Sequence, residues 1–390
     1  MTHNRHQTKD TNRQGYVSNH GGNIYKAALE LDIPENAIID FSASINPLGI
    51  SDNVKDVIKN DLDSLIHYPD PDTTLLRQFL AEHHGIASNS ILCGNGSTEL
   101  IYLLPRALKP EKVLITSPTF SEYEKACRLS HASRVTRYRL PPKDNFRIKP
   151  DEFIAAMREM SSDNSGNPLN SSPVTRHASR SLNMAFLCNP NNPTGRVLKK
   201  KEVLEVAEAA RELKCVLIID EAFIDFIPGH SAIKEVAGNP YLIVLRSMTK
   251  FHALTGLRIG YAVISERLTG KVLKFKEPWT VNSLAQKAAL AALGDTDYND
   301  RTMHLMKEEK VFLEYVFKDI GVSFIPSDTN YYLLKIKEAR KVHNQLMEKG
   351  IMVRDCSNFR GLDDSYIRVA VKSRIDNKRL LKEMASLCKK

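Results

Sequence analysis

Residues 241–264 read YLIVLRSMTKFHALTGLRIGYAVI and carry one lysine between two apolar, strand-like runs. Lys250 therefore falls at the end of a buried strand, which is an unusual place for an ordinary solvated lysine. If the chain held only an isolated Ser-x-x-Lys, a loop lysine beside a glycine turn would be the simpler interpretation. Here Ser247 stands three residues before Lys250, and Arg258 stands eight residues after it. This spacing favours a lysine with a chemical role.

Short apolar runs bounded by turn residues recur through the middle of the chain, as in strands of a sheet covered on both faces. They are Val113–Thr116, Met184–Cys188, Val216–Asp220, Leu242–Leu245 and Ile259–Ile264. Helical patterns lie between them. The clearest is Lys199–Lys214, where Val203, Val206, Ala207, Ala210 and Leu213 form one apolar stripe. This alternation predicts an α/β domain with a mostly parallel, mixed sheet.

The rest of the chain predicts its division into parts. Residues 1–18 are polar and predict a disordered tail, 19–49 an N-terminal arm and part of a small domain, 50–285 the large domain, and 286–390 a C-terminal α+β small domain. A long helix-like stretch begins near Asn282, and strand candidates follow at Tyr331–Ile336 and Tyr366–Val371. Ser161–Ser181 is rich in Ser, Asn, Arg and Pro, and we interpret it as a surface insertion or flexible loop.

The composition excludes several classes of protein. The 390 residues are 42% apolar, enough for two lobes, yet no run approaches the roughly 18 apolar residues of a membrane span, and the N-terminus lacks a secretory signal. The net charge is +9, but the basic residues are dispersed without a nucleic-acid motif, which suits small anionic ligands better. The six cysteines form no Cys-x-x-Cys pair, so we expect buried or incidental thiols of a reduced, cytoplasmic protein without a metal site.

Three further motifs place polar residues beside apolar runs. Asp220 closes the run CVLIID, where a carboxylate is costly unless it is paired, although a helix N-cap aspartate is the alternative. Asn192 lies in NPNNPTG after the run MAFLC, and the pairs Asn-Pro and Thr-Gly by themselves simply mark turns. The segment GNGST at residues 94–98 opens a helical pattern. A glycine-rich turn into a helix N-terminus suits a phosphate, although Ser and Thr also cap helices there.

Together these motifs resemble the class I/II aminotransferases, which have the aspartate-aminotransferase fold (fold type I) and use pyridoxal 5'-phosphate. The resemblance covers roughly residues 20–385, with the motifs in family order. It implies that Lys250 forms an imine with the cofactor aldehyde. It also implies that the cofactor phosphate is bound by Ser97, Thr98, Ser247 and Arg258, of which the arginine offers a planar, always-charged donor fork.

The resemblance assigns three more residues to the cofactor ring. Asn192 hydrogen-bonds the phenolic oxygen, and Phe120, in the segment SPTF, stacks on the ring. Asp220 pairs with the protonated pyridine nitrogen, which keeps the ring an acceptor of electrons.

The N-terminal segments narrow the choice within the family. HGGN at residues 20–23 and DFSASINPLG at residues 40–49 together resemble threonine-phosphate decarboxylases of cobalamin biosynthesis, whose close relatives are the histidinol-phosphate aminotransferases. Read alone, HGGN is a flexible turn. The resemblance implies a homodimer with shared active sites, in which His20 and Gly21 reach the substrate of the other subunit. It also implies a substrate contact at Ser44, where the relatives carry asparagine.

Two arginines of the C-terminal part stand fourteen residues apart at strand-like positions, Arg354 in GIMVRDC and Arg368 in SYIRVAV. The resemblance implies that Arg368 binds the substrate carboxylate, that Arg354 faces its phosphate, and that Asn192 also contacts the substrate. Two placed guanidinium groups suit a substrate with two anionic ends. Phe223 stands where many aminotransferases have a tyrosine hydroxyl, which favours decarboxylation over transamination.

The activity implied is decarboxylation of O-phospho-L-threonine to (R)-1-aminopropan-2-yl phosphate, with Lys250 as the catalytic residue. Because Ser44 departs from the family pattern, decarboxylation of O-phospho-L-serine to ethanolamine phosphate is an alternative. A second alternative is histidinol-phosphate aminotransferase. A third is a catalytically silent binding protein, against which the intact Lys250 argues.

Overall fold

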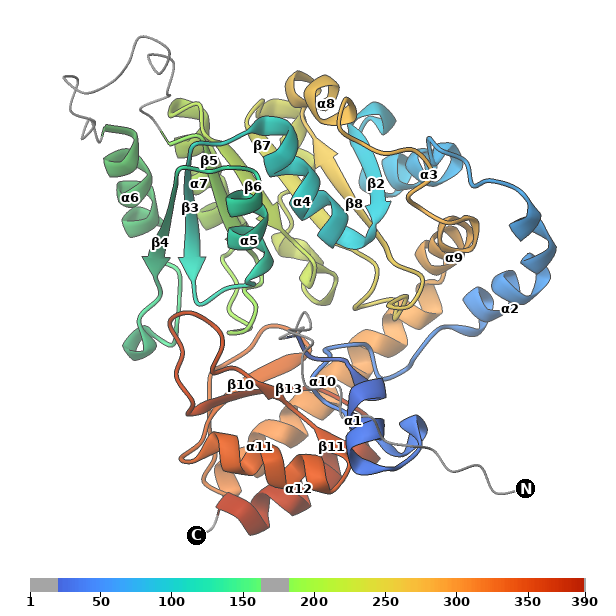
Figure 1. Ribbon diagram of the computed structural model, residues 1–390, viewed down its shortest axis with the longest axis vertical. Helices are drawn as coiled ribbons and strands as arrows, with labels where there is room; N and C mark the ends of the chain where they lie inside the picture. The colour runs from blue at the N-terminus through green and yellow to red at the C-terminus, as the bar shows by residue number, and fades with distance from the viewer. Residues whose placement is uncertain (1–19, 163–181, 389–390) are drawn as a thin grey trace, which may run out of the picture.

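The computed structural model describes residues 20–162 and 182–388. The tail predicted over residues 1–18, and the part of the predicted loop from residue 163 to 181, lie outside the described residues. Ser161 and Ser162, which we had assigned to that loop, are the last residues of helix α6. Figure 1 shows the described residues as a large lobe built on one sheet, with a smaller lobe packed below it.

Within the described residues, seven strands form the sheet of the large lobe. In spatial order they are β2 (Ile91–Asn95), β8 (Ile259–Ile264), β7 (Leu242–Ser247), β6 (Val216–Asp220), β5 (Met184–Cys188), β3 (Lys112–Ser117) and β4 (Arg134–Arg139). In this sheet β8 runs antiparallel to both of its neighbours, and the other pairs are parallel. The predicted mostly parallel sheet and its five predicted strands are confirmed. Strands β2 and β4 are the two edges of this sheet and were not predicted, because β2 has the short apolar run ILC before a glycine and β4, RVTRYR, is polar.

Helices cover both faces of this sheet because alternate side chains of its strands point in opposite directions. In β6, Leu217 and Ile219 pack into one core, whereas Val216 and Ile218 pack into the other. On the first face lie α2 (Asp52–Asn60), α3 (Thr74–His84), α6 (Pro150–Ser162), α7 (Lys200–Glu212) and α9 (Ser283–Leu293). On the second face lie α4 (Gly96–Leu108), α5 (Glu122–Leu129) and α8 (Glu266–Leu273). The helix predicted at Lys199–Lys214 is therefore confirmed as α7, with its apolar stripe packed on the sheet.

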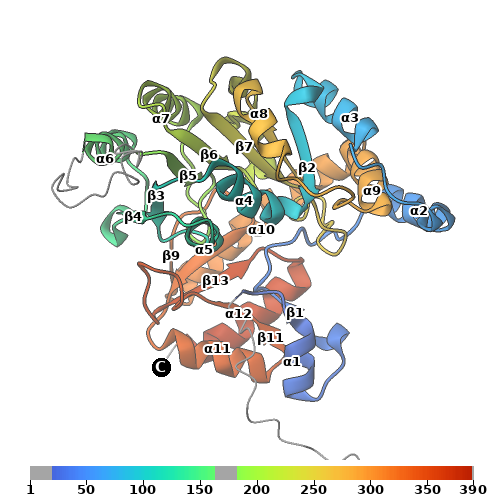
Figure 2. The same cartoon turned by 45° about the horizontal axis from the view of Figure 1, so that its top comes forward.

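The small lobe combines both ends of the described chain. Its elements are α1 (Ile24–Leu31), β1 (Ile39–Asp40), α10 (Thr296–Asp319), β9 (Ser323–Phe324), β10 (Tyr331–Lys335), α11 (Ala339–Glu348), β11 (Ile351–Met352), β12 (Arg354–Asp355), β13 (Tyr366–Ala370) and α12 (Arg374–Cys388). Strand β1 pairs in parallel with β11, and Figure 2 shows α1, β1 and β11 side by side. The strands predicted at Tyr331–Ile336 and Tyr366–Val371 are β10 and β13, which pair antiparallel.

The long helix-like stretch predicted from Asn282 is two helices, α9 and α10. They separate at Gly294 and Asp295, where the Asp295 side chain accepts a hydrogen bond from the Tyr298 N–H and caps α10. The alanines of α9 pack in the core of the large lobe, so the packing favours a domain boundary near Gly294 over residue 285. The domain limits themselves stay a prediction. No helix in the described ranges is long and apolar enough to cross a membrane.

Candidate active site

The predicted site residues meet at one edge of the large sheet. Parallel strands β5, β6 and β7 end at this edge, which brings together the segment after Cys188, Asp220 and Ser247. Because β8 runs in the opposite direction, it starts at the same edge, directly after Arg258. Ligands of open α/β sheets bind outside the carboxyl ends of their strands. Here those ends border a cavity of about 390 Å³, lined by every residue that the sequence analysis assigned to the cofactor or substrate.

One end of the cavity is built for an anion. Ser97 and Thr98 occupy the first turn of α4, whose N–H groups and dipole favour negative charge. Gly96 has φ +73°, and a Cβ there would lie 2.4 Å from Nη2 of Arg258, so the glycine lets the guanidinium pack against the turn. Ser247 lies beside them, with its Oγ 2.8 Å from the Thr249 hydroxyl. The residues predicted to bind the cofactor phosphate therefore lie together in the structure.

A buried carboxylate also lines the cavity. Asp220 is 4% exposed, and its oxygens accept hydrogen bonds from the Tyr123 hydroxyl at 2.6 Å and from the Ala222 N–H at 3.0 Å. Burial raises the pKa of Asp220, while these hydrogen bonds and Lys250 oppose that rise. A cationic group in the cavity would compensate the desolvated charge. This is the environment expected of a carboxylate that pairs with a protonated ring nitrogen.

Lys250 faces the same cavity from the loop after β7. Burial, followed by the positive charges of Arg368 and Arg258, lowers the pKa of Lys250 to about 8. The loop is fixed from the N-terminal arm, since Asn46 donates from its backbone N–H to the Lys250 carbonyl at 3.0 Å and from its side chain to the Phe251 carbonyl at 2.8 Å. The segment DFSASINPLG therefore supports the lysine as well as lining the site.

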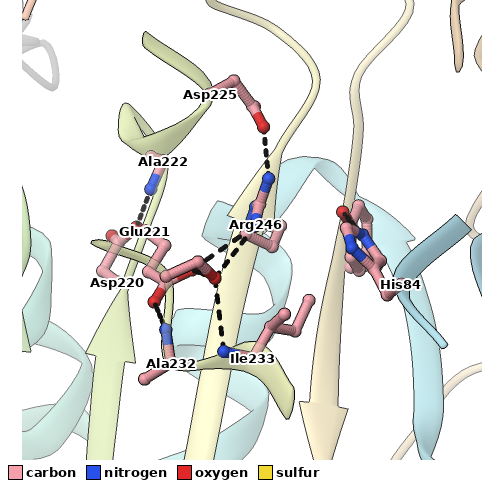
Figure 3. Close-up of polar contacts among 10 residues, drawn as sticks. His84, Asp220, Glu221, Ala222, Asp225, Ala232, Ile233 and Arg246 are labelled. Carbon is pink, nitrogen blue, oxygen red and sulfur yellow. Dashed lines mark hydrogen bonds and ion pairs between the residues drawn. The ribbon is translucent and has the colours of Figure 1, made fainter. Parts of the chain in front are cut away.

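A buried ionic network joins the ends of β6 and β7 (Figure 3). Arg246, the residue before Ser247, lies between Glu221 and Asp225, with Nη1 3.4 Å from the Glu221 carboxylate and Nη2 paired with Asp225. Glu221 also accepts hydrogen bonds from the Ala232 N–H and from a neighbouring serine hydroxyl. The network fixes the strand end that carries Asp220 against the strand end that leads to Lys250.

The small lobe supplies the other wall. Arg354 of β12 and Arg368 of β13 are directly opposite each other in an antiparallel pair, and both line the cavity. Arg368 donates to the Asn192 side-chain oxygen and, at 2.7 Å, to the Ser42 carbonyl. Its buried Nε has no hydrogen-bond partner among the described residues, nor has the buried Ser44 hydroxyl. These unpaired polar atoms suit a polar, anionic substrate group.

The N-terminal segment HGGN lies against the segment that contains Ser44. The Gly22 N–H donates to the Ser42 hydroxyl at 2.7 Å, and a Cβ on Gly21 would lie 2.6 Å from the Ser42 carbonyl oxygen. His20 lines the cavity of its own chain, where its Nε2 lies 2.9 Å from the Glu122 carboxylate. That His20 and Gly21 also reach the substrate of a neighbouring subunit stays a prediction.

Comparisons with known proteins agree with this geometry. The family model "Aminotransferase class I and II" matches residues 36–384. The chain belongs to this family. It is 36% identical to the threonine-phosphate decarboxylase of Salmonella typhimurium, over 94% of this chain and 95% of that one.

Two further relatives illustrate the range of this family. An adenosylcobalamin biosynthesis bifunctional protein of Leptospira interrogans is 31% identical over 94% of this chain, which spans only 41% of that longer protein. Among solved structures, the histidinol-phosphate aminotransferase of Clostridium acetobutylicum superposes with a TM-score of 0.78 at 28% identity, covering 89% of this chain and 98% of that one.

The cofactor of this family member is pyridoxal 5'-phosphate, and the residues present fit it. The anion-binding end would hold the phosphate, Asp220 would pair with the ring nitrogen, and Phe120 forms a wall against which a ring can stack. Asn192 uses its oxygen to accept from Arg368, which leaves its N–H groups to donate to the phenolic oxygen. Phe223 is buried against the ring of Tyr331 and offers no hydroxyl there.

Sequence reasoning missed three polar residues of the site. Tyr123 donates a hydrogen bond to Asp220, Glu122 contacts His20, and Tyr102 donates a hydrogen bond to Glu122. Glu122 and Tyr123 directly follow the segment SPTFS, so their position beside a cofactor motif was a usable signal. Tyr102 carried no such signal, because it lies within an ordinary amphipathic helical pattern.

Proposed function

We propose that this chain decarboxylates O-phospho-L-threonine to (R)-1-aminopropan-2-yl phosphate, for the nucleotide loop of cobalamin. The observation that carries the proposal is the pair Arg354 and Arg368, which face one cavity from opposed positions of two strands. Two guanidinium groups match a small substrate with a carboxylate and a phosphate. The 36% identity to a threonine-phosphate decarboxylase over nearly the whole length of both chains supports the same substrate class.

The residues of the chain divide the reaction between them. When bound, the cofactor supplies an aldehyde that bonds to amines and a protonated ring that accepts the electron pair of a broken bond. Asp220 holds the proton on the ring nitrogen, and Arg368 orients the substrate carboxylate that leaves as carbon dioxide. Lys250 then delivers a proton to Cα, a task suited to an amine whose pKa is lowered to about 8.

Histidinol-phosphate aminotransferase is the second candidate, favoured by the structural likeness to that enzyme from Clostridium acetobutylicum. Decarboxylation is preferred because Phe223 lacks the hydroxyl of many aminotransferases and because HGGN lies at the substrate cavity. Purified enzyme should release carbon dioxide from O-phosphothreonine without consuming a 2-oxo acid. Efficient amino transfer from glutamate to imidazole-acetol phosphate would refute the proposal.

O-Phospho-L-serine is the alternative substrate. It differs from O-phosphothreonine by one methyl group, worth about 1–3 kcal/mol in a pocket. Ser44 presents its unpaired hydroxyl where the relatives carry an asparagine, which changes the reach and hydrogen bonding of this wall. We keep phosphothreonine as the preferred substrate, and parallel kcat/KM measurements on both compounds decide the matter.

We also propose that the chain forms a cytoplasmic homodimer. Support for the dimer comes from large apolar side chains that are at least half exposed, among them Tyr68 and Trp279, whose rings lie 5.2 Å apart. Leu62, Leu65 and Ile66, just before Tyr68 in the sequence, are also at least half exposed. Light scattering should give twice the chain mass of 44.0 kDa. Among the residues that the structure describes, five cysteines are buried and free, which supports the reducing location.

A further inference from the structure

Glu122 is a carboxylate in a cavity that otherwise gathers cations for an anionic substrate. It is the first residue of α5, is 7% exposed, and lines the cavity that also contains Lys250, Arg354 and Arg368. An unpaired carboxylate there would repel a phosphate and would be costly to bury. A carboxylate at this position therefore needs a partner that gives its negative charge a role in binding.

Both oxygens of Glu122 are engaged by side chains from distant parts of the chain. Oε1 lies 2.9 Å from Nε2 of His20, Oε2 accepts a short hydrogen bond from the Tyr102 hydroxyl, and Lys125 approaches to 3.8 Å. The hydrogen bonds from His20 and Tyr102 lower the pKa of Glu122 to about 2, so the carboxylate stays ionised at neutral pH. Tyr102 fixes the carboxylate from α4, and the carboxylate in turn fixes the imidazole.

The orientation of His20 follows from these contacts. With Nε2 directed at Glu122, Nδ1 is the ring nitrogen left to meet a ligand in the cavity. The ring lies 5.6 Å from that of Phe120, which limits its rotation on the other side.

We propose that Glu122, held by Tyr102, is a positioning residue that orients the His20 imidazole so that Nδ1 can bind the anionic group of the substrate. The inference rests on the proposed function for the identity of that substrate. The link itself runs from Tyr102 through Glu122 to His20. Glu122 takes part in binding without touching the reacting atoms, so its removal raises KM and leaves kcat nearly unchanged.

The test compares holoenzyme variants Glu122→Gln, Tyr102→Phe, His20→Ala and the double variant Glu122→Gln/His20→Ala. We expect Glu122→Gln to raise the KM for O-phosphothreonine about tenfold with kcat within about twofold, and Tyr102→Phe to raise KM about threefold. Because Glu122 acts through His20, Glu122→Gln should add less than about twofold to the KM of His20→Ala. Additive effects, an unchanged KM, or a loss confined to kcat would each overturn the proposal.

Glu124→Gln is the matched control. Glu124 is a similarly buried carboxylate on the same helix, but it pairs with Arg128 and Arg137 and has no contact with His20. This variant should leave the affinity for anions within about twofold. Cofactor absorbance and melting temperature must be retained in every variant that is compared.

Binding of inorganic phosphate to the holoenzyme, measured by calorimetry, separates this inference from the proposed function. If O-phosphothreonine is no substrate, a tenfold weaker phosphate affinity in Glu122→Gln, absent in the His20→Ala background, still supports the link. If phosphate affinity is unchanged in Glu122→Gln while the wild type decarboxylates O-phosphothreonine, the link is refuted and the proposed function stands.

Discussion

Lys250→Met should stabilise the cofactor-free protein at neutral pH while abolishing covalent attachment of the cofactor. Burial and the charges of Arg368 and Arg258 lower the pKa of Lys250 to about 8, from an ordinary value of 10.5. Each pH unit of this difference is worth about 1.4 kcal/mol, so the buried charge destabilises the folded state by roughly 3 kcal/mol below pH 8. Methionine has a similar shape and carries no charge.

The expected gain depends on pH with a definite sign. Between pH 8 and 10.5 the unfolded chain binds more protons than the folded one, so the stability of the wild type rises with pH and the advantage of methionine shrinks. At pH 9.5 about 1.4 kcal/mol of the effect remains. For a lobe of this size, 3 kcal/mol corresponds to roughly 6–12 °C in melting temperature.

Calorimetric melting of the cofactor-free wild type and Lys250→Met at pH 6.5, 8.0 and 9.5 measures the effect. Lys271→Met, an exposed lysine of α8, is the control and should show no pH-dependent difference. A lower melting temperature for Lys250→Met, or a gain that is identical at all three pH values, would refute the argument from the buried charge. After the cofactor has been added back to the same preparations, borohydride should trap a cofactor adduct in the wild type only.

Three other predictions follow from contacts in the site. Arg246→Ala should lower the free energy of unfolding by about 3–5 kcal/mol, because it removes the cationic partner of the fully buried Glu221; a second change, Glu221→Gln, should restore part of this loss, and denaturant titration measures both. Ser44→Asn should raise the kcat/KM ratio of O-phosphothreonine to O-phosphoserine about tenfold, and an unchanged ratio would show that position 44 does not set the choice. Mixing His20→Ala with inactive Lys250→Ala should leave the raised KM of His20→Ala unchanged, since His20 and Lys250 line the cavity of one chain; a restored KM with demonstrated subunit exchange would establish shared sites.

The parts of the site that were predictable lie at the ends of apolar strands. Asp220 and Lys250 stand out because charged side chains are rare at the end of a buried apolar strand. Lys250 also stands at fixed spacings from Ser247 and Arg258. For this reason the residues that bind the cofactor could be predicted from the sequence, because the ends of parallel strands lie at one edge of the sheet.

Contacts between residues that are far apart in the sequence could not be predicted. The spacing of fourteen positions from Arg354 to Arg368 did not show that the two are opposed, because the register of β12 and β13 depends on the turn between them. The contact of Glu122 with His20 spans 102 residues, and nothing local marks it. Strands β2 and β4 could not be predicted, because a long apolar run identifies a central strand, whereas the apolar run of β2 is short and β4 is polar.

The pairing of β1 with β11 sets an order of events during synthesis. Ile39 is made 312 residues before its partner Ile351, which at about 5–20 residues per second is a delay of roughly 15–60 s. All strands of the large sheet emerge within that interval, so the residues around Lys250 can assemble while the N-terminal arm still lacks the strand it joins. We therefore expect a newly made chain to be able to capture cofactor before its arm docks, and to become able to hold substrate only when its last strands arrive.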